Sequence, residues 1–307
     1  MSQNSQIKVV VTGASGLLGR AVVKEAKRCG YNVIGTAFRR AAGGLVALDL
    51  TNYEATKEFI ASERPNAIIH CAVEKNPQAA AANRASAELL NVTVSGQLAR
   101  LAREAGAFFM YVSTEYVFDG RNPPYTEESE PNPLNFYGQT KLDGERAVLD
   151  ACPAAAAVLR VPLLYGKTVD PAESTFGGII KMLDQSRGKT VEVDAWQHRF
   201  PVCIDDVARV LVDMTAKSCS DKRADIAGVF QFAPTEMLTR YDMCVVLADI
   251  LKISDVTLVP LTEQQKSDGV ERPKNAQMST GALERAGINV GYVPFRQWWS
   301  QHLGGQT

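Results

Sequence analysis

Near the start of the chain stands the run Val9-Val10-Val11-Thr12-Gly13-Ala14-Ser15-Gly16-Leu17-Leu18-Gly19. Its β-branched residues favour a strand, and its glycines, spaced three apart, lead into a helical pattern over residues 20–28. Gly13 permits a tight turn, Gly16 lets the backbone approach a pyrophosphate, and Gly19 lets the helix pack close to the strand. The free N–H groups at the start of the helix would hold the phosphates. This run therefore predicts a dinucleotide-binding unit.

Strand and helix patterns alternate after this turn. Strand patterns cover residues 31–37, 67–71, 108–112 and 157–161, and helix patterns cover residues 53–62, 79–105 and 136–150. Elements that alternate at these lengths form a parallel sheet through right-handed crossovers. We therefore predict an α/β fold with a doubly wound parallel Rossmann sheet, and we assign residues 7–166 to this dinucleotide-binding domain.

The pattern loosens beyond residue 166. Short helices are expected near residues 176–185, 205–217 and 240–251, and short strands near Val191 and Phe230. We assign residues 167–307 to a smaller C-terminal α/β substrate lobe over the carboxyl ends of the strands. Its boundary is soft and interleaved because no linker divides the two parts. The proline-rich loop 119–135 is either a solvated connection or, as we favour from its length, a cover for the site.

The overall composition excludes several classes of protein. Hydrophobic residues make up 46% and charged residues 22%, and the formal net charge of −1 gives no electrostatic case for binding nucleic acid or an anionic membrane. No apolar run approaches the ~20 residues of a membrane-spanning helix. The cysteines lack CxxC spacing and the histidines are dispersed, so we expect free thiols and no metal site. The polar start, residues 1–6, predicts a disordered tail rather than a signal peptide, and we expect a cytoplasmic protein.

Residues 38–40 indicate which dinucleotide is bound. An NAD-binding fold carries an acid near the end of its second strand, about 20 residues after the glycines, that binds the ribose 2′-OH. Here that place holds Phe38-Arg39-Arg40 and no acid. A guanidinium can clamp a 2′-phosphate that a carboxylate would repel, so we predict NADP. The alternative is a pair of solvated arginines at the end of a strand.

Further cofactor contacts are expected at the ends of other strands. Asp49-Leu50 lies where an adenine-binding pair would lie, and Cys71-Ala72-Val73 supplies small residues, although either could be ordinary packing. The predicted cofactor-binding set is completed by Ser15, Leu17, Leu18, Asn91, Tyr137, Lys141 and Pro162.

A second motif, Tyr137-Gly138-Gln139-Thr140-Lys141, opens the helix expected at residues 136–150. Its spacing puts Tyr137 and Lys141 on one helix face. A nearby ammonium would lower the phenol pKa from its reference value of ~10 toward neutral pH, where Tyr137 could act in acid–base chemistry. Thr114, at the end of a strand, would hold a substrate carbonyl. We predict Thr114, Glu115, Tyr137 and Lys141 as catalytic residues, although YxxxK alone is common as an exposed helix pair.

The glycine turn together with Thr114, Tyr137 and Lys141 resembles the extended short-chain dehydrogenase/reductases. The segment 113–120, Ser-Thr-Glu-Tyr-Val-Phe-Asp-Gly, is similar to the STDYVFDG signature of the dTDP-4-dehydrorhamnose reductase branch, and residues 132–138 and 272–276 fit it too. The branch has Asp where this chain has Glu115, and a shift of about 1 Å matters in catalytic geometry. The resemblance implies an NADPH-dependent reductase of a 4-keto nucleotide-sugar.

Within this branch the chain resembles the regulatory β subunits of methionine adenosyltransferase. The matching stretches are residues 16–22, 38–40, 70–72, 106–108, 140–145, 199–201 and 272–277. This resemblance implies an NADP-loaded partner of a catalytic subunit that makes S-adenosylmethionine, with Tyr137 and Lys141 chiefly holding the dinucleotide. That family has a longer docking tail than the few residues that follow Trp299, which leaves the docking contact open.

The two functions differ most in the second lobe. Local likeness favours the regulatory subunit, and the intact Thr–Tyr–Lys set keeps the reductase as the alternative. The expected substrate-facing residues are Glu74, Trp196 and Arg199, and the cluster at residues 196–200 either faces a diphosphate sugar or packs in the core. Trp298 and Trp299 either pack on the core or lie at an interface.

Overall fold

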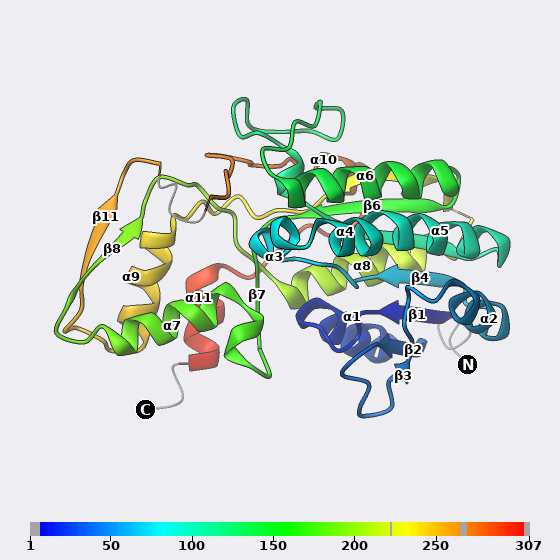
Figure 1. Cartoon of the computed structure of the whole chain (residues 1–307), viewed down its shortest axis with the longest axis horizontal. Coiled ribbons are helices and arrows are strands. Elements are labelled where there is room, and N and C mark those ends of the chain that lie inside the picture. The colour runs from blue at the N-terminus through cyan, green and yellow to red at the C-terminus, as the bar shows by residue number, and fades with distance from the viewer. Residues whose placement is uncertain (1–6, 222, 265–268, 304–307) are drawn as a thin grey trace.

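The computed structural model describes residues 7–221, 223–264 and 269–303. The chain forms a seven-stranded parallel sheet with helices on both faces, and a smaller unit lies at one end of it (Figure 1). The prediction of an α/β Rossmann fold is therefore confirmed. The expected tail, residues 1–6, lies outside the described residues. Within those residues, each helix is too short or too polar to cross a membrane.

The sheet has the strand order β10-β6-β5-β4-β1-β2-β3. Its strands are β1 (Lys8–Thr12), β2 (Asn32–Ala37), β3 (Val46–Ala47), β4 (Ala67–His70), β5 (Phe108–Thr114), β6 (Ala156–Val161) and β10 (Gly228–Gln231). The chain winds from β1 through β2 to β3, then returns to β4 on the other side of β1. Doubly wound folds bind ligands at such a reversal, outside the carboxyl ends of the strands.

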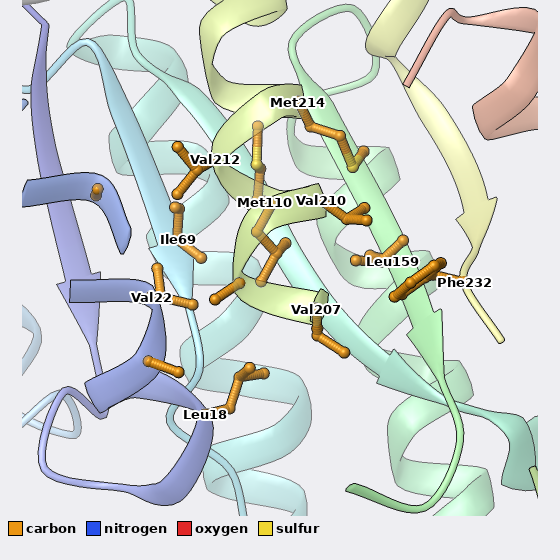
Figure 2. Packing of buried hydrophobic residues seen from close by; sticks show 14 of the residues in the cluster. Leu18, Val22, Ile69, Met110, Leu159, Val207, Val210, Val212, Met214 and Phe232 are labelled. Atoms are coloured by element: carbon orange, nitrogen blue, oxygen red, sulfur yellow. The ribbon is translucent and has the colours of Figure 1, made fainter. Parts of the chain in front are cut away.

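Alternate side chains of the strands face two helical layers. One layer holds α1 (Leu17–Arg28) and α8 (Ile204–Ser218), and the other holds α2 (Tyr53–Glu63), α5 (Ser95–Glu104) and α6 (Phe136–Ala151). Figure 2 shows Ile69, Met110 and Leu159 of three neighbouring strands packed against α1 and α8. The strands are apolar on both faces, as expected for a parallel sheet covered on both sides.

The smaller unit has a core of its own. It comprises β7 (Leu164–Tyr165), β8 (Thr190–Asp194), β9 (Val202–Cys203), β11 (Thr257–Leu261), η4 (Pro171–Glu173), α7 (Thr175–Gln185), α9 (Arg240–Ile250) and α11 (Phe295–Leu303). The ring of Tyr165 meets the rings of Phe295 and Trp298 edge-on, with centroids 5.2 and 5.3 Å away. Trp298 and Trp299 are buried in this core, so within the described chain they pack in the core and are not exposed at a surface.

Part of the stretch assigned to the second lobe returns to the sheet. α8 packs against α1, and β10 extends the sheet by pairing with β6, from Gly228 opposite Ala157 to Gln231 opposite Arg160. The short η5 (Arg223–Ile226) and α10 (Gly281–Arg285) contact α8 and β10. Residues 167–307 therefore do not form one continuous lobe, because the chain crosses to the sheet and back again.

The single helix expected at residues 79–105 is wrong in detail. The structure breaks it into α3 (Pro77–Ala82), α4 (Arg84–Glu88), the π-helical turn η2 (Leu89–Val94) and α5. Asn83 leaves the helical conformation at φ −131° and ψ 71°, and its side chain caps the backbone N–H of Ser86. An asparagine that can cap a new helix competes with continuation of the old one.

Loop 119–135 does not cover the site. None of its residues lines the cleft described below. Tyr125 instead stacks on Phe118 with ring centroids 4.1 Å apart, and its backbone N–H donates to the carbonyl of Gln277 at 2.8 Å. The buried side chain of Gln231 also donates to the Tyr125 carbonyl at 3.1 Å. The loop is therefore held at the β10 side of the sheet, and the expected covering role is wrong.

Candidate functional site

A cleft of about 1180 Å³ lies between the carboxyl ends of the sheet strands and the smaller unit. The Rossmann side contributes the glycine turn and the ends of β2, β4, β5 and β6, and the smaller unit contributes residues around Glu173 and Trp196. Each residue predicted to bind cofactor or substrate, or to act in catalysis, lines this cleft except Asn91. The residues selected from the sequence therefore converge on one cleft.

The glycine turn is shaped to admit phosphate groups. Gly13 has φ +64°, and a Cβ there would lie 2.7 Å from the backbone nitrogen of Ala72, just after β4. A Cβ on Gly19 would collide with the Gly13 carbonyl. Helix α1 begins at Leu17, earlier than the expected residue 20, and among the described residues no side chain caps its N-terminus. The turn thus leaves N–H groups at a positive helix end, which fits a dinucleotide pyrophosphate.

The arginines after β2 lie at the rim of the cleft. Phe38, Arg39 and Arg40 are exposed, and the Arg39 guanidinium lies 5.9 Å from the ring centroid of Phe38. Arg40 is engaged by a carboxylate from the smaller unit, since its Nη1 lies 2.8 Å from Glu173 Oε1. Arg40 is therefore ion-paired as well as exposed to solvent, whereas Arg39 packs beside Phe38.

The adenine-side residues also face the cleft. Asp49 Oδ1 accepts hydrogen bonds from the backbone N–H and the hydroxyl of Thr51, at 3.0 and 2.7 Å. These bonds fix the turn that presents Asp49 and Leu50 to the cleft. At the end of β4, burial raises the pKa of the Cys71 thiol to about 12, so this thiol stays protonated at neutral pH.

Lys141 is almost completely buried beneath the cleft. Its Nζ donates to the carbonyl of Val112 at 2.8 Å and lies 3.8 Å from the ring centroid of Tyr111. Burial lowers the pKa of Lys141 to about 7, while the Glu145 carboxylate acts in the opposite direction. The lysine is therefore held at a fixed place on the cleft floor with a pKa near neutrality.

Tyr137 departs from the expected electrostatics. Burial raises the pKa of its phenol above the ordinary value, and a hydrogen bond with Thr114 partly offsets this rise. Lys141 does not lower the pKa of Tyr137 as predicted. Its ammonium is directed instead to the Val112 carbonyl and the Tyr111 ring. In this structure Tyr137 is thus a neutral hydroxyl beside Thr114, able to donate a hydrogen bond into the cleft.

Glu115 and Arg199 both line the cleft, and they are close enough for their charges to interact. Burial raises the pKa of Glu115 to about 8, and the charge of Arg199 acts in the opposite direction. Arg199 donates from Nη2 to Gln197 Oε1 at 2.6 Å, whereas its buried Nε finds no hydrogen-bond partner among the described residues. Trp196 lines the cleft and Phe200 is buried, so the cluster at residues 196–200 divides between site and core.

Asn91 does not line the cleft. It is buried in η2, where its Oδ1 accepts from the backbone N–H of Glu74 at 2.9 Å and its Nδ2 donates to Thr140 Oγ1 at 3.0 Å. It therefore positions the Glu74 segment and the start of α6 instead of contacting a ligand directly. Glu74 itself lines the cleft, with Oε1 accepting from the backbone N–H of Asn76 at 3.0 Å.

Several basic residues of the cleft were missed. Lys75, Arg240 and Arg272 line it, and Arg20 lies beside its glycine turn, where Nη1 donates to the Ser15 carbonyl. Arg20 could have been found, because it follows Gly19 directly in the first helical turn. The others carry no local signal, since only the folded chain brings them to the cleft. The described residues include no cluster of three or more His, Cys, Asp or Glu side chains placed to hold a metal ion.

A glycine turn at the reversal of a parallel sheet, with Thr114, Tyr137 and Lys141 on the cleft wall, defines an extended short-chain dehydrogenase/reductase fold and site. The family model described as "RmlD substrate binding domain" matches residues 7–301, so the chain belongs to that family.

Named relatives fall into two groups. The chain is 40% identical over 301 residues to methionine adenosyltransferase 2 subunit beta from Danio rerio, covering 96% of this chain and 91% of that protein. It is 30% identical over 292 residues to dTDP-4-keto-6-deoxy-D-glucose reductase from Streptomyces niveus, covering 94% and 93%. The crystal structure of a dTDP-4-dehydrorhamnose reductase from Clostridium acetobutylicum has a TM-score of 0.83 and 28% identity, covering 96% of this chain and 98% of that one.

Proposed function

We propose that this chain is an NADP-binding regulatory β subunit of a methionine adenosyltransferase, which modulates the synthesis of S-adenosylmethionine. The observation that carries the proposal is the 40% identity to a protein named as such a subunit, over 96% of this chain. The identity to the named reductase is 30% over a similar length. The partner is the catalytic subunit of the synthetase.

The residues of the cleft fit NADP as the bound ligand. The N-terminus of α1 would hold the pyrophosphate, Arg39 and Arg40 the 2′-phosphate, and Asp49 the adenosine end. Lys141 would contact the ribose next to the nicotinamide, and Tyr137 would donate a hydrogen bond close by. In the regulatory role the dinucleotide acts as a structural ligand of the subunit.

Co-purification with the catalytic subunit from the same source tests the proposal. The full chain is mixed with that subunit, with and without NADP, and resolved by size-exclusion chromatography, and the synthetase kinetics are then measured. The proposal expects co-elution and changed kinetics. An Arg39→Asp variant, in which NADP binding should be weakened, is the matched control that shows whether association depends on NADP. Absence of association under both conditions contradicts the regulatory role.

A second candidate is an NADPH-dependent reductase of a 4-keto nucleotide-sugar, and the neutral Tyr137 beside Thr114 favours it. When bound, NADPH would supply the hydride to the carbonyl carbon. Thr114 would hold the carbonyl oxygen, and the Tyr137 hydroxyl would give its proton to the alkoxide that forms. The hydrogen bond with Thr114 would stabilise the tyrosinate left behind.

The reductase is tested by NADPH oxidation with a dTDP-4-keto-6-deoxy-sugar, followed at 340 nm. The reductase is supported if the unmodified chain turns over and the Tyr137→Phe variant binds NADPH but does not turn over. If the chain binds the synthetase but shows no turnover, the reductase is rejected and the regulatory function is the one supported.

A further inference from the structure

Glu173 joins the two sides of the cleft through a single carboxylate. Its Oε2 lies 2.6 Å from Arg20 Nη2, and its Oε1 lies 3.1 Å from Arg20 Nη1 and 2.8 Å from Arg40 Nη1. The backbone N–H of Val169 also donates to Oε2, at 3.2 Å. The Glu173 side chain is only 9% exposed, although it belongs to the short surface helix η4.

Both arginines come from the phosphate-binding side of the fold. Arg20 lies in the first turn of α1, beside the glycine turn, and Arg40 follows β2, where the sequence predicts recognition of a 2′-phosphate. Arg20 has little capacity left for another anion, because its Nη1 also donates to the Ser15 carbonyl at 2.6 Å. A phosphate at this place must therefore displace the carboxylate, since the two anions repel each other and compete for the same donors.

The segment that carries Glu173 has few other ties to the Rossmann side. Val169 is 80% exposed, and the other hydrogen bonds of η4, from Glu173 N to the Asp170 carbonyl and from Ala172 N to Asp170 Oδ1, are local. Among the described residues, the polar ties from this segment to the Rossmann side are those of Arg20, Arg40 and Lys75, whose Nζ donates to the Glu173 carbonyl at 2.6 Å. Loss of the carboxylate contacts would leave the Lys75 bond as the remaining one of these ties and so loosen the segment.

We propose that Glu173 is an internal anion that occupies Arg20 and Arg40 and competes with the phosphates of an adenine dinucleotide for them. Binding exchanges arginine–carboxylate pairs for arginine–phosphate pairs and loosens the hold of the Rossmann side on residues 168–174. Hydrogen bonds from Arg20 hold the pKa of Glu173 at about 2, so the carboxylate is charged at every physiological pH and competes throughout. This inference rests on the dinucleotide-binding part of the proposed function.

The first test compares Glu173→Gln with Asp170→Asn in the full chain. Both variants remove one negative charge from the same segment, but Asp170 contacts neither arginine in the structure. Calorimetric titration with NADP, NAD and 2′,5′-ADP is expected to give at least about tenfold tighter NADP binding for Glu173→Gln, because a charge-assisted competitor is lost. Asp170→Asn is expected to bind like the unmodified chain.

The three ligands identify which phosphate competes. A gain for NADP and 2′,5′-ADP that exceeds the gain for NAD places the competition at the 2′-phosphate, and an equal gain for NADP and NAD places it at the pyrophosphate. Unchanged or weaker NADP binding by Glu173→Gln overturns the inference while the dinucleotide proposal stands. If neither the unmodified chain nor the variant binds any dinucleotide, the proposed cofactor role fails as well.

The second test uses the unmodified chain and so does not depend on a variant. Hydrogen–deuterium exchange of the peptide that spans residues 168–174 is measured with and without saturating NADP. The inference expects faster exchange with NADP, together with fast exchange in Glu173→Gln before any ligand is added. Slower exchange with NADP would mean that the segment closes over the ligand with Glu173 still paired, which contradicts the inference.

Discussion

Arg39 is the residue at which the choice between NADP and NAD is tested most directly. It is exposed at the cleft rim and is predicted to contact the 2′-phosphate that NAD lacks. Replacing it with aspartate should weaken NADP binding by about 10- to 100-fold, because charge-assisted hydrogen bonds are lost and a repulsive charge is added. NAD binding should change little. Calorimetry on Arg39→Asp, with the exposed Arg100→Asp on α5 as control, measures both; an equal loss for the two ligands rejects the 2′-phosphate assignment.

Glu115 should make the stability of the fold depend on pH. The folded chain keeps the proton of Glu115 up to about pH 8, whereas the unfolded chain releases it near its ordinary value of 4.5. Folding therefore takes up a proton between these values, and this contribution to stability falls as the pH rises from 4.5 to 8. Glu115→Gln removes the effect.

The variant should thus gain stability relative to the unmodified chain as the pH is raised, by more than about 1 kcal/mol between pH 5 and pH 8. Urea unfolding at both pH values measures the change, and the exposed Glu192→Gln on β8 is the control. A difference between Glu115→Gln and the unmodified chain that is the same at both pH values would show that Glu115 titrates normally.

Residues of the site were predictable where their signal was local. The glycine turn and the Tyr137–Lys141 spacing are defined over a few positions, and the structure places all of these residues at the cleft. The Arg20–Glu173 pair joins residues 153 positions apart, and no pattern in the sequence connects them. The pKa of Tyr137 was missed because it depends on burial, which the spacing of two residues on a helix cannot show.

At the level of elements, the close approach of α6 to η2 depends on Gly144. A Cβ at this position would collide with the Asn91 carbonyl and the Tyr111 hydroxyl. Gly144→Ala should therefore destabilise the fold by about 1–3 kcal/mol, as overpacking does. Gly178 in α7 is the matched control, because a Cβ there meets no atom within 4 Å and Gly178→Ala should be neutral or slightly stabilising. Chemical denaturation compares the two, and similar effects would remove the argument for a close contact.

The elements themselves were predicted unevenly. Alternating strands and helices indicated the parallel sheet, because each carries a clear hydrophobic period. The break at Asn83 and the π-helical turn were hidden, since an alanine-rich stretch reads as helix whether it is continuous or divided. The role of loop 119–135 was wrong because its length suggested a function, whereas its partners, Gln231 and Gln277, lie far along the chain.

For the whole molecule, the interleaved chain predicts cooperative unfolding. The three tryptophans lie in the cleft or in the core of the smaller unit, whereas most helices and strands that dominate far-ultraviolet circular dichroism belong to the Rossmann unit. Because α8 and β10 tie the two units together, thermal unfolding followed by tryptophan fluorescence and by circular dichroism should give the same midpoint. A fluorescence midpoint several degrees below that of circular dichroism would show that the smaller unit unfolds on its own.

Little in the sequence indicates that the chain returns to the sheet to add β10. A short strand near Phe230 was expected, but its partner was not, because β10 pairs with a strand about 70 positions earlier. Such pairing depends on which edge remains open after the other strands have assembled. The sequence pattern indicates that a strand exists and does not indicate which edge it joins.

That late strand also has a consequence for the chain as it is made. Six of the seven sheet strands lie within residues 8–161, but the edge of β6 waits for residues 228–231. While the ribosome adds the intervening residues, β6 presents unpaired N–H and C=O groups to the cell, as any open edge strand does. The nascent chain therefore passes through a stage in which it is nearly folded yet prone to association, and a chaperone that covers this edge would protect it until β10 emerges.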